Sequence, residues 1–308
     1  MSIIETTKLT KVYDNVPVVN NVNLKIEEGQ IFGFLGPNGA GKTTTILMLL
    51  GLTVPTSGKA IIAGFDSTRD ALKVKKMAGY VPEKVGFYND MSARQNLLYT
   101  ANLNGVFGDS ADKAVNQALI GVGLKDRMDD FVGRYSKGMR QRLAIADILV
   151  KTPKVAFLDE PTSGIDPEGI NQILDLISQI AKTNAMTIVV SSHQLSQVQR
   201  ICTHVGIMSK GKLVSSGSIV ELSKQARGGK IIIEVQLAEF SKDIVESIGK
   251  IPGVTNVKNE ENMLTIACND DLRQKIAKVI SDKNGLITKM DVRGVTLDDI
   301  YMRIVQGA

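Results

Sequence analysis

The chain has 308 residues, of which 43% are hydrophobic and 22% are charged, and its mean hydropathy is +0.03. These values exclude a disordered or fibrous protein, and the length favours about two domains. The net charge of +5 is mild for this length, and the densest basic stretch, 73–76, has no interleaved aromatic residues, so we expect no nucleic acid partner. No apolar run approaches the roughly 18 residues of a membrane span, and the N-terminus lacks the pattern of a secretory signal, so we expect a cytosolic protein.

The first predicted elements have the order strand, loop and helix. Residues 3–28 are expected to form short strands joined by a turn at Asp14-Asn15, and the apolar run 30–35 is expected to form a buried strand. A glycine-rich loop follows, and residues 43–50 have a helical pattern. A phosphate-binding loop requires this order of elements.

The loop itself matches the pattern G-x-x-x-x-G-K-[ST] in full. Its residues are Gly36, Pro37, Asn38, Gly39, Ala40, Gly41, Lys42 and Thr43, and we add Thr44 to the predicted binding segment. Glycines let backbone N–H groups surround phosphate oxygens, while Lys42 would meet the β and γ oxygens and Thr43 would offer its hydroxyl to magnesium. The sequence therefore predicts ATP and Mg²⁺ as ligands.

The pattern becomes helical from about Glu83 to Ile148. One clear helix start is Ser92, because Gln95 three residues later completes a capping box. Strands return at 155–158 and 187–191 as short apolar runs suited to a parallel sheet that is covered on both faces. We therefore expect an α/β core interrupted by a helical segment at about residues 84–148.

Two carboxylates, Asp159 and Glu160, end the predicted strand at 155–158. Sites of open parallel sheets lie at the carboxyl ends of strands. Asp159 would hold magnesium, and Glu160 would orient or deprotonate the attacking water. An acidic pair alone can equally cap a helix, but the phosphate loop favours the catalytic interpretation.

Residues 135–142 read Tyr-Ser-Lys-Gly-Met-Arg-Gln-Arg, which resembles the Leu-Ser-Gly-Gly-Gln signature of ATP-binding cassette (ABC) proteins. The match departs at Tyr135, Lys137 and Met139 but retains Ser136 and Gly138. In the family, the retained positions meet the γ-phosphate of ATP held by the opposite subunit. A hydroxyl and a small residue at a helix start suit an anion. A plain helix cap is the alternative.

Further residues match the family in order. Tyr13 resembles the aromatic residue that stacks on adenine, although an isolated tyrosine is more often a packing residue. Residues 163–166, which end in Asp166, resemble the loop that crosses the dimer interface. His193 resembles the switch histidine that contacts the γ-phosphate. Glu83 stands where most of the family has glutamine, and its oxygen could still face magnesium.

The combination of Pro82-Glu83 with the Tyr-Ser-Lys-Gly-Met motif resembles the cassette subunits of simple two-component exporters. The resemblance covers about residues 3–222 and implies an ATP-binding domain over residues 1–223, with a P-loop NTPase core and an N-terminal antiparallel β subdomain. It further implies an integral membrane permease as partner, a homodimer or heterodimer with a related cassette subunit, and a location on the inner face of the cell membrane. Exposed apolar groups in 86–91 are candidates for the permease contact, or they belong to the core.

The C-terminal part follows a linker predicted at 224–229. The expected order βαββαβ is that of a ferredoxin-like domain over residues 230–308. Its expected elements are a strand at 230–236, a helix at 240–249, strands at 253–258 and 262–267, a helix at 270–283, a strand at 286–292 and a last helix capped by Thr296. No catalytic pattern is found there, so dimer support, regulation and ligand binding all stay open for this domain.

The sequence thus predicts an ATP-hydrolysing subunit in which two chains face each other. Each ATP would lie between Lys42 and Thr43 of one chain and Ser136 and Gly138 of the other. The alternative of a soluble cassette ATPase acting on ribosomes or DNA is disfavoured, because the chain has neither a second cassette nor a long coiled-coil insertion. A non-enzymatic nucleotide sensor would not need Glu160 and His193. The two cysteines, 202 and 268, have apolar neighbours and are expected to be buried and reduced.

Overall fold

The computed structural model describes residues 2–227, 231–293 and 297–306. Its contacts divide the chain into two compact units, Met1–Ile219 and Val220–Gly307, and the division falls at the start of a helix, α8 (Ile219–Arg227). Within the described ranges, no helix is both long enough and apolar enough to cross a membrane. Each unit has its own hydrophobic core.

An antiparallel sheet forms the N-terminal part of the first unit. Its strands are β1 (Ser2–Tyr13), β2 (Val16–Glu27), β4 (Ser57–Ile62) and β5 (Phe65–Asp66), in the order β2-β1-β4-β5. Asp14 and Asn15 have φ angles of +45° and +64° in the turn between β1 and β2, as a two-residue hairpin requires. The predicted turn is confirmed, although the two strands that it joins have 12 residues each and are not short.

A second, central sheet carries the predicted α/β core. Its six strands are β3 (Ile31–Leu35), β6 (Ala78–Val81), β7 (Val155–Asp159), β8 (Thr187–Ser192), β9 (His204–Ser209) and β10 (Lys212–Ser218). The order is β10-β9-β3-β8-β7-β6, and only the pair of β9 and β10 is antiparallel. Every residue of β3, β7 and β8 is buried. This is the burial expected of parallel strands covered on both faces.

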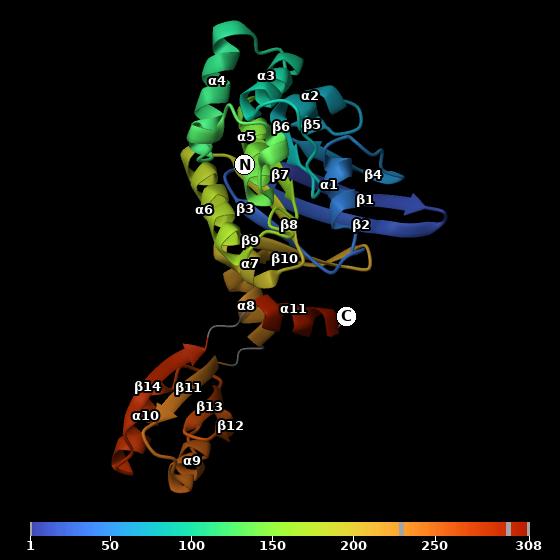
Figure 1. Cartoon of the computed structure of the whole chain (residues 1–308). Coiled ribbons are helices and arrows are strands. Elements are labelled where there is room, and N and C mark those ends of the chain that lie inside the picture. Colours follow the sequence, from blue (N-terminus) through green and yellow to red (C-terminus); the bar gives the residue numbers. More distant parts are fainter. Residues whose placement is uncertain (1, 228–230, 294–296, 307–308) are drawn as a thin grey trace. The chain divides into compact units, whose positions relative to one another are not determined.

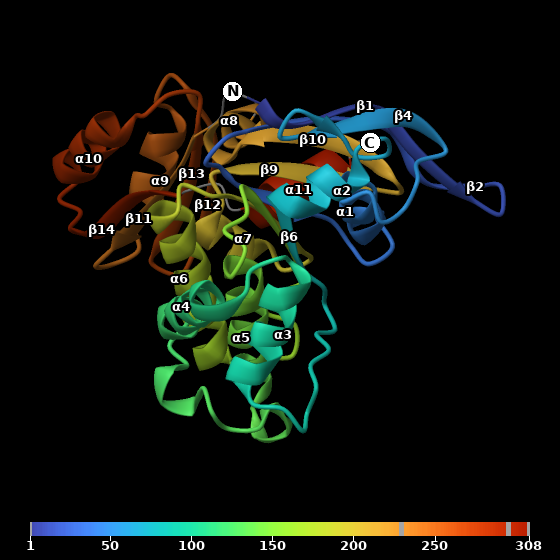
Figure 2. The same ribbon diagram turned by 90° about the horizontal axis from the view of Figure 1, so that it is seen from above.

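The helices of the first unit are α1 (Lys42–Leu49), α2 (Ala71–Met77), α3 (Ala93–Leu103), α4 (Gly108–Gly121), α5 (Lys137–Leu149), α6 (Pro167–Thr183) and α7 (Leu195–Ile201). Figures 1 and 2 show α3 and α4 together on one side of this unit, away from β1 and β2. The capping box is present, because the backbone N–H of Gln95 donates to Ser92 Oγ and that of Ser92 donates to Gln95 Oε1. The helical pattern was expected from Glu83, but the first helix begins at Ala93, after its cap.

The core of the first unit joins the antiparallel sheet, α1 and the central sheet. Ile4 of β1, Phe34 of β3, Ile46 of α1 and Phe157 of β7 are all completely buried in it. Burial of one such side chain contributes about 1.5–3 kcal/mol to stability. Because α1 is anchored on both sides, the start of α1 and the loop before it are held in place.

The second unit shows the predicted βαββαβ order. After α8 come β11 (Ile231–Leu237), α9 (Lys242–Gly249), β12 (Val254–Glu260), β13 (Met263–Cys268), α10 (Arg273–Asp282), β14 (Ile287–Arg293) and α11 (Leu297–Gln306). The strand order β12-β13-β11-β14, antiparallel throughout, is that of a ferredoxin-like sheet. Residues 224–227 were expected to belong to the linker, but they continue α8, because they are good helix formers. The predicted cap Thr296 lies outside the described residues.

Candidate functional site

Three adjacent parallel strands bring the predicted nucleotide residues to one edge of the central sheet. Leu35 at the end of β3 is paired with Ser192 at the end of β8, and Asp159 at the end of β7 is paired with Ser191. The glycine-rich loop follows β3, the carboxylates end β7, and His193 follows β8. Segments that are more than a hundred residues apart in the sequence therefore meet at the same edge.

The glycine-rich loop wraps around the ammonium group of Lys42. Lys42 Nζ donates hydrogen bonds to the carbonyl oxygens of Gly36, at 2.7 Å, and Pro37, at 3.2 Å, and the side chain is buried. Gly41 precedes α1 with a φ of +99°, and a Cβ atom added there would lie 2.6 Å from the carbonyl oxygen of Val18 on β2. Glycine is thus required at 41 both by the backbone angle and by the close strand.

Thr43 and Asp159 form a pair of oxygen ligands next to this loop. Thr43 Oγ1 donates to Asp159 Oδ2 at 2.8 Å, and Ser191 Oγ donates to the other carboxylate oxygen. A hydroxyl and a carboxylate suit Mg²⁺, which commonly takes one or two protein oxygens together with waters and substrate phosphates. The residues present therefore fit a magnesium ion, and they are held side by side by their own hydrogen bond.

Glu160 lies between two cationic or polar groups. Its carboxylate is 3.7 Å from Lys42 Nζ, and both of its oxygens lie 3.0 Å from His193 Nδ1. The backbone of Glu160 has a φ of +48°, and its N–H donates to the carbonyl oxygen of Ser191 at 3.1 Å. The Glu160 side chain is only 10% exposed, whereas that of His193 is 45% exposed. The strained turn at Glu160 therefore aims a shielded carboxylate at the loop lysine.

The signature residues Ser136 and Gly138 line a hollow that the phosphate loop does not line. Ser136 caps α5, and its side chain accepts a hydrogen bond from the N–H of Met139 at 3.2 Å. Asp166 caps α6 in the same way, through the N–H of Gly169 at 3.3 Å. A cavity of about 310 Å³ is lined by Ser136, Gly138 and Asp166 together with other residues of α5 and α6. Two helix starts thus face one hollow, and helix starts favour anions.

Two of the predicted site residues, Tyr13 and Glu83, make no contact with the cluster of Lys42, Asp159 and Glu160 in the bonds of the described chain. Tyr13 ends β1 with its ring 47% exposed, and Lys11 Nζ lies 4.9 Å from the ring centroid. This exposure leaves the tyrosine accessible to a base. Glu83 is exposed, and its carboxylate lies 3.5 Å from Ser163 Oγ. Among the described residues, no hydrogen bond joins Glu83 to Asp159.

Sequence reasoning missed the polar residues that support the site. Ser191 was treated as part of an apolar strand, yet it holds both Asp159 and the backbone of Glu160. Thr162 and Gln197 are buried and hydrogen-bonded to each other, although 35 positions separate them. A polar residue at the end of a buried strand is a signal that could have revealed Ser191. No local pattern pairs Thr162 with Gln197.

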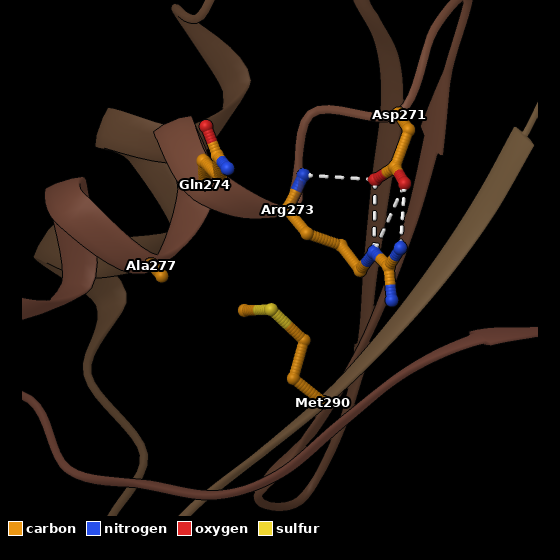
Figure 3. Close-up of a pocket in the computed structure, with 5 residues that line it drawn as sticks. All are labelled: Asp271, Arg273, Gln274, Ala277 and Met290. Atoms are coloured by element: carbon orange, nitrogen blue, oxygen red, sulfur yellow. Dashed lines mark hydrogen bonds and ion pairs between the residues drawn. The ribbon is translucent and has the colours of Figure 1, made fainter.

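The second unit has an open hollow of about 570 Å³ between α10 and β14. Figure 3 shows Met290 crossing it and Arg273 turned toward Asp271, with Gln274 and Ala277 on the helix side. Arg273 and Asp271 form an ion pair at 2.7 Å. Because these two charges neutralise each other, the hollow shows no group poised for acid–base or nucleophilic chemistry.

Both cysteines are free and buried, as expected. Burial raises the pKa of the Cys202 thiol far above its ordinary value of 9.0, and it also raises the pKa of Cys268, with Asp271 as a smaller cause. A thiol with a raised pKa is a poor nucleophile at neutral pH. The cysteines are therefore structural.

Comparison with known proteins gives two matches to family models. Residues 19–163 match the model described as "ABC transporter", and residues 217–305 match "ATP-binding protein DrrA1-3-like, C-terminal domain". The first match contains the glycine-rich loop, the signature residues and the carboxylate pair. The second covers α8, the ferredoxin-like elements and most of α11.

Individual proteins are similar over most of the chain. The bacitracin transport ATP-binding protein BcrA of Bacillus licheniformis is 35% identical, and the alignment covers 99% of this chain and 98% of that protein. The linearmycin resistance ATP-binding protein LnrL of Bacillus subtilis is 31% identical, covering 85% and 84%. A solved structure from Clostridium perfringens, part of the ABC transporter complex cbiONQ, has a TM-score of 0.67 at 28% identity and covers 74% of this chain and 93% of that one.

Proposed function

The chain belongs to the ATP-binding subunits of ABC transporters, and from this premise we propose that it binds and hydrolyses ATP to power export through a separate membrane permease. The observation that carries the proposal is the cluster of Lys42, Glu160 and His193 at the edge formed by β3, β7 and β8. Relatives named for bacitracin transport and linearmycin resistance support the direction of transport. No cargo is proposed, because the cargo path belongs to the permease.

ATP binds with its phosphates in the loop 36–44. The backbone N–H groups of the loop and the start of α1 face the phosphates, and Lys42 exchanges its carbonyl partners for the β and γ oxygens. Tyr13 stacks on adenine with its exposed ring face. Thr43 and Asp159 would hold Mg²⁺, and the family resemblance adds Glu83 as a further proposed oxygen ligand. The ion, when bound, neutralises charge on the phosphates.

Hydrolysis requires a base for water and positive charge near the transferred phosphoryl group. Glu160 orients or deprotonates the water, and its low exposure strengthens its electrostatic effect. Lys42 and His193 both contact Glu160 and are thus within reach of the group that the water attacks. They stabilise the charge that develops on the phosphoryl oxygens.

A second subunit completes the site. Ser136, Gly138 and Asp166 line their own hollow on α5 and α6, which supports a half-site directed at the γ-phosphate held by a partner chain. The partner is a second copy or a related cassette subunit. Closure of the pair on ATP, followed by hydrolysis and reopening, is the motion that drives the permease.

The helical segment is the surface that we assign to the permease, with the protein held at the inner face of the membrane. Tyr88 is 53% exposed and Tyr99 is 46% exposed, and their rings make an edge contact at 5.5 Å. Leu103 lies one turn beyond Tyr99 on α3 and is also exposed. Tyrosine is enriched at protein interfaces, so this apolar face suits contact with a partner.

The central test replaces Glu160 by glutamine. Removal of one preorganised group typically costs about 100- to 1,000-fold in turnover, so Glu160→Gln should bind ATP, barely hydrolyse it and accumulate as an ATP-bound dimer in size-exclusion chromatography. Glu28→Gln removes the same charge from an exposed turn of the first unit and serves as the matched control. Rapid ATP turnover by Glu160→Gln would overturn the assignment. Copurification with ribosomes or DNA, instead of a membrane protein, would overturn the role in transport.

A further inference from the structure

A chain of hydrogen bonds, buried at Thr162 and Gln197, links the segment that carries Glu160 to the segment that carries His193. Thr162 Oγ1 donates to Gln197 Oε1 at 2.5 Å, and Gln197 Nε2 donates to Gln194 Oε1 at 2.5 Å. Thr162 follows Glu160 by two residues, and Gln194 directly follows His193. The exposed fractions of Thr162 and Gln197 are 2% and 9%. Each end of this chain therefore lies beside a residue of the proposed reaction.

The side-chain contact between Glu160 and His193 is lost in the proposed reaction, and the backbone hydrogen bond of Glu160 goes to Ser191, two residues before His193. Glu160 must turn to water and His193 to phosphate, so their contact at 3.0 Å is exchanged for contacts with the substrate. Water also competes for the imidazole, which is 45% exposed. The bond between Thr162 and Gln197 is buried, and the Gln194 end of the chain is half-buried. Buried polar groups rarely give up their partners.

We propose that Gln197 is a positioning residue that fixes the spacing between Glu160 and His193 through Thr162 and Gln194. The proposal rests on the proposed function, because it assigns Gln197 a role in ATP hydrolysis. In the described part of the chain, no hydrogen bond joins Gln197 to Glu160 or His193, and Gln197 acts through the turn after β7 and the start of α7. Its effect falls on catalytic geometry and leaves the phosphate loop unchanged.

The amide group suits this role because it both accepts and donates. Its oxygen accepts from the Thr162 hydroxyl while its nitrogen donates to the Gln194 side chain. A leucine of similar size does neither. A glutamate accepts from Thr162, and the Gln194 amide can turn so that its nitrogen donates to the new carboxylate. Glutamate at 197 is therefore expected to retain the link, and leucine to lose it.

The test measures ATP hydrolysis by the purified full-length chain carrying Gln197→Leu. Misplacement of a reacting group by about 1 Å can cost on the order of 100-fold, so kcat should fall by roughly 10- to 100-fold while KM and the affinity for a fluorescent ATP analogue stay unchanged. Gln117→Leu, on the exposed side of α4, is the matched control and should behave as the wild type. Gln197→Glu should keep most of the activity.

A double variant separates positioning from a purely structural role. Thr162→Val should lower kcat as Gln197→Leu does, and each single change leaves a buried polar group without its partner, which lowers the melting temperature. The double variant removes both polar groups, so its melting temperature should recover. Its kcat should stay low, because the link is still missing. Recovery of kcat together with melting temperature would overturn the proposal.

A spectroscopic readout reports the geometry without turnover. The chain has only two histidines, so the ring signals of His193 can be assigned in a histidine-labelled sample against His193→Ala. These signals should shift in Gln197→Leu and not in Gln117→Leu. Wild-type kcat in Gln197→Leu would overturn this inference, whereas a wild-type chain that hydrolyses no ATP would instead overturn the proposed function.

Discussion

Replacing Gly41 by alanine tests the close approach between the phosphate loop and β2. A Cβ atom at Gly41 would lie 2.6 Å from the carbonyl oxygen of Val18 and 3.2 Å from a methyl group of Val19, and the backbone φ of +99° is unfavourable for alanine. Gly39 offers a matched control, since its φ is +79° and no atom lies within 4 Å of an added Cβ. The two substitutions share the backbone strain and differ in the steric conflict.

The magnitudes follow from these two contributions. A left-handed backbone costs alanine roughly 1–2 kcal/mol, which applies to both variants. Overpacking against a backbone that cannot retreat adds about 1–3 kcal/mol for Gly41→Ala alone. For a unit of this size, 1 kcal/mol lowers the melting temperature by about 2–4 °C, so Gly41→Ala should melt roughly 2–12 °C below Gly39→Ala.

The assay is thermal unfolding followed by circular dichroism, with titration of a fluorescent ATP analogue on the same samples. Gly41→Ala should also lose more nucleotide affinity, because a shift of the loop moves Lys42 and the start of α1. Equal melting temperatures of the two variants would show that the close approach of β2 does not constrain the loop.

Three other outcomes are expected. Tyr13→Ala should weaken binding of a fluorescent ATP analogue by roughly 5- to 150-fold, the equivalent of about 1–3 kcal/mol of base stacking, while Tyr13→Phe binds normally; equal affinity of the two would exclude stacking. Ser92→Ala should lower the free energy of unfolding by about 1 kcal/mol in urea titrations, because it removes the capping box of α3, and Ser110→Ala inside α4 should not. The native chain should resist a thiol reagent at pH 8, because burial raises the pKa of the Cys202 thiol above 9.0. The stability that this neutral thiol contributes is fully present below pH 9 and is lost as the pH rises through the folded pKa. Reaction of native Cys202 at pH 8 would contradict its burial.

The sequence was sufficient to predict which edge of the central sheet carries the site. Carboxyl ends of parallel strands share one edge, so the loop after β3 and the pair Asp159 and Glu160 had to meet there. The order of strands and helices in the second unit could also be predicted, because the hydrophobic periodicity changes clearly between its strands and its helices.

Side-chain links between distant positions could not be read from one sequence. The bond between Thr162 and Gln197 depends on how the turn after β7 packs against α7, and no periodic pattern encodes it. The pair Gly228-Gly229 is typical of a linker, but the helix formers at 224–227 before it extend α8. Packing decides whether such a segment continues a helix or forms a linker.

The position of Glu160 has a consequence for which anions the phosphate loop retains. Its carboxylate is 3.7 Å from Lys42 Nζ and is largely shielded from water, so any phosphate that seeks this ammonium competes with a resident negative charge. A lone phosphate or sulfate ion would contact only part of the loop, whereas a nucleotide would also make the proposed adenine contact and accept from more of the backbone N–H groups. We therefore expect the Glu160 carboxylate to disfavour binding of small free anions at the loop, in addition to its proposed part in hydrolysis.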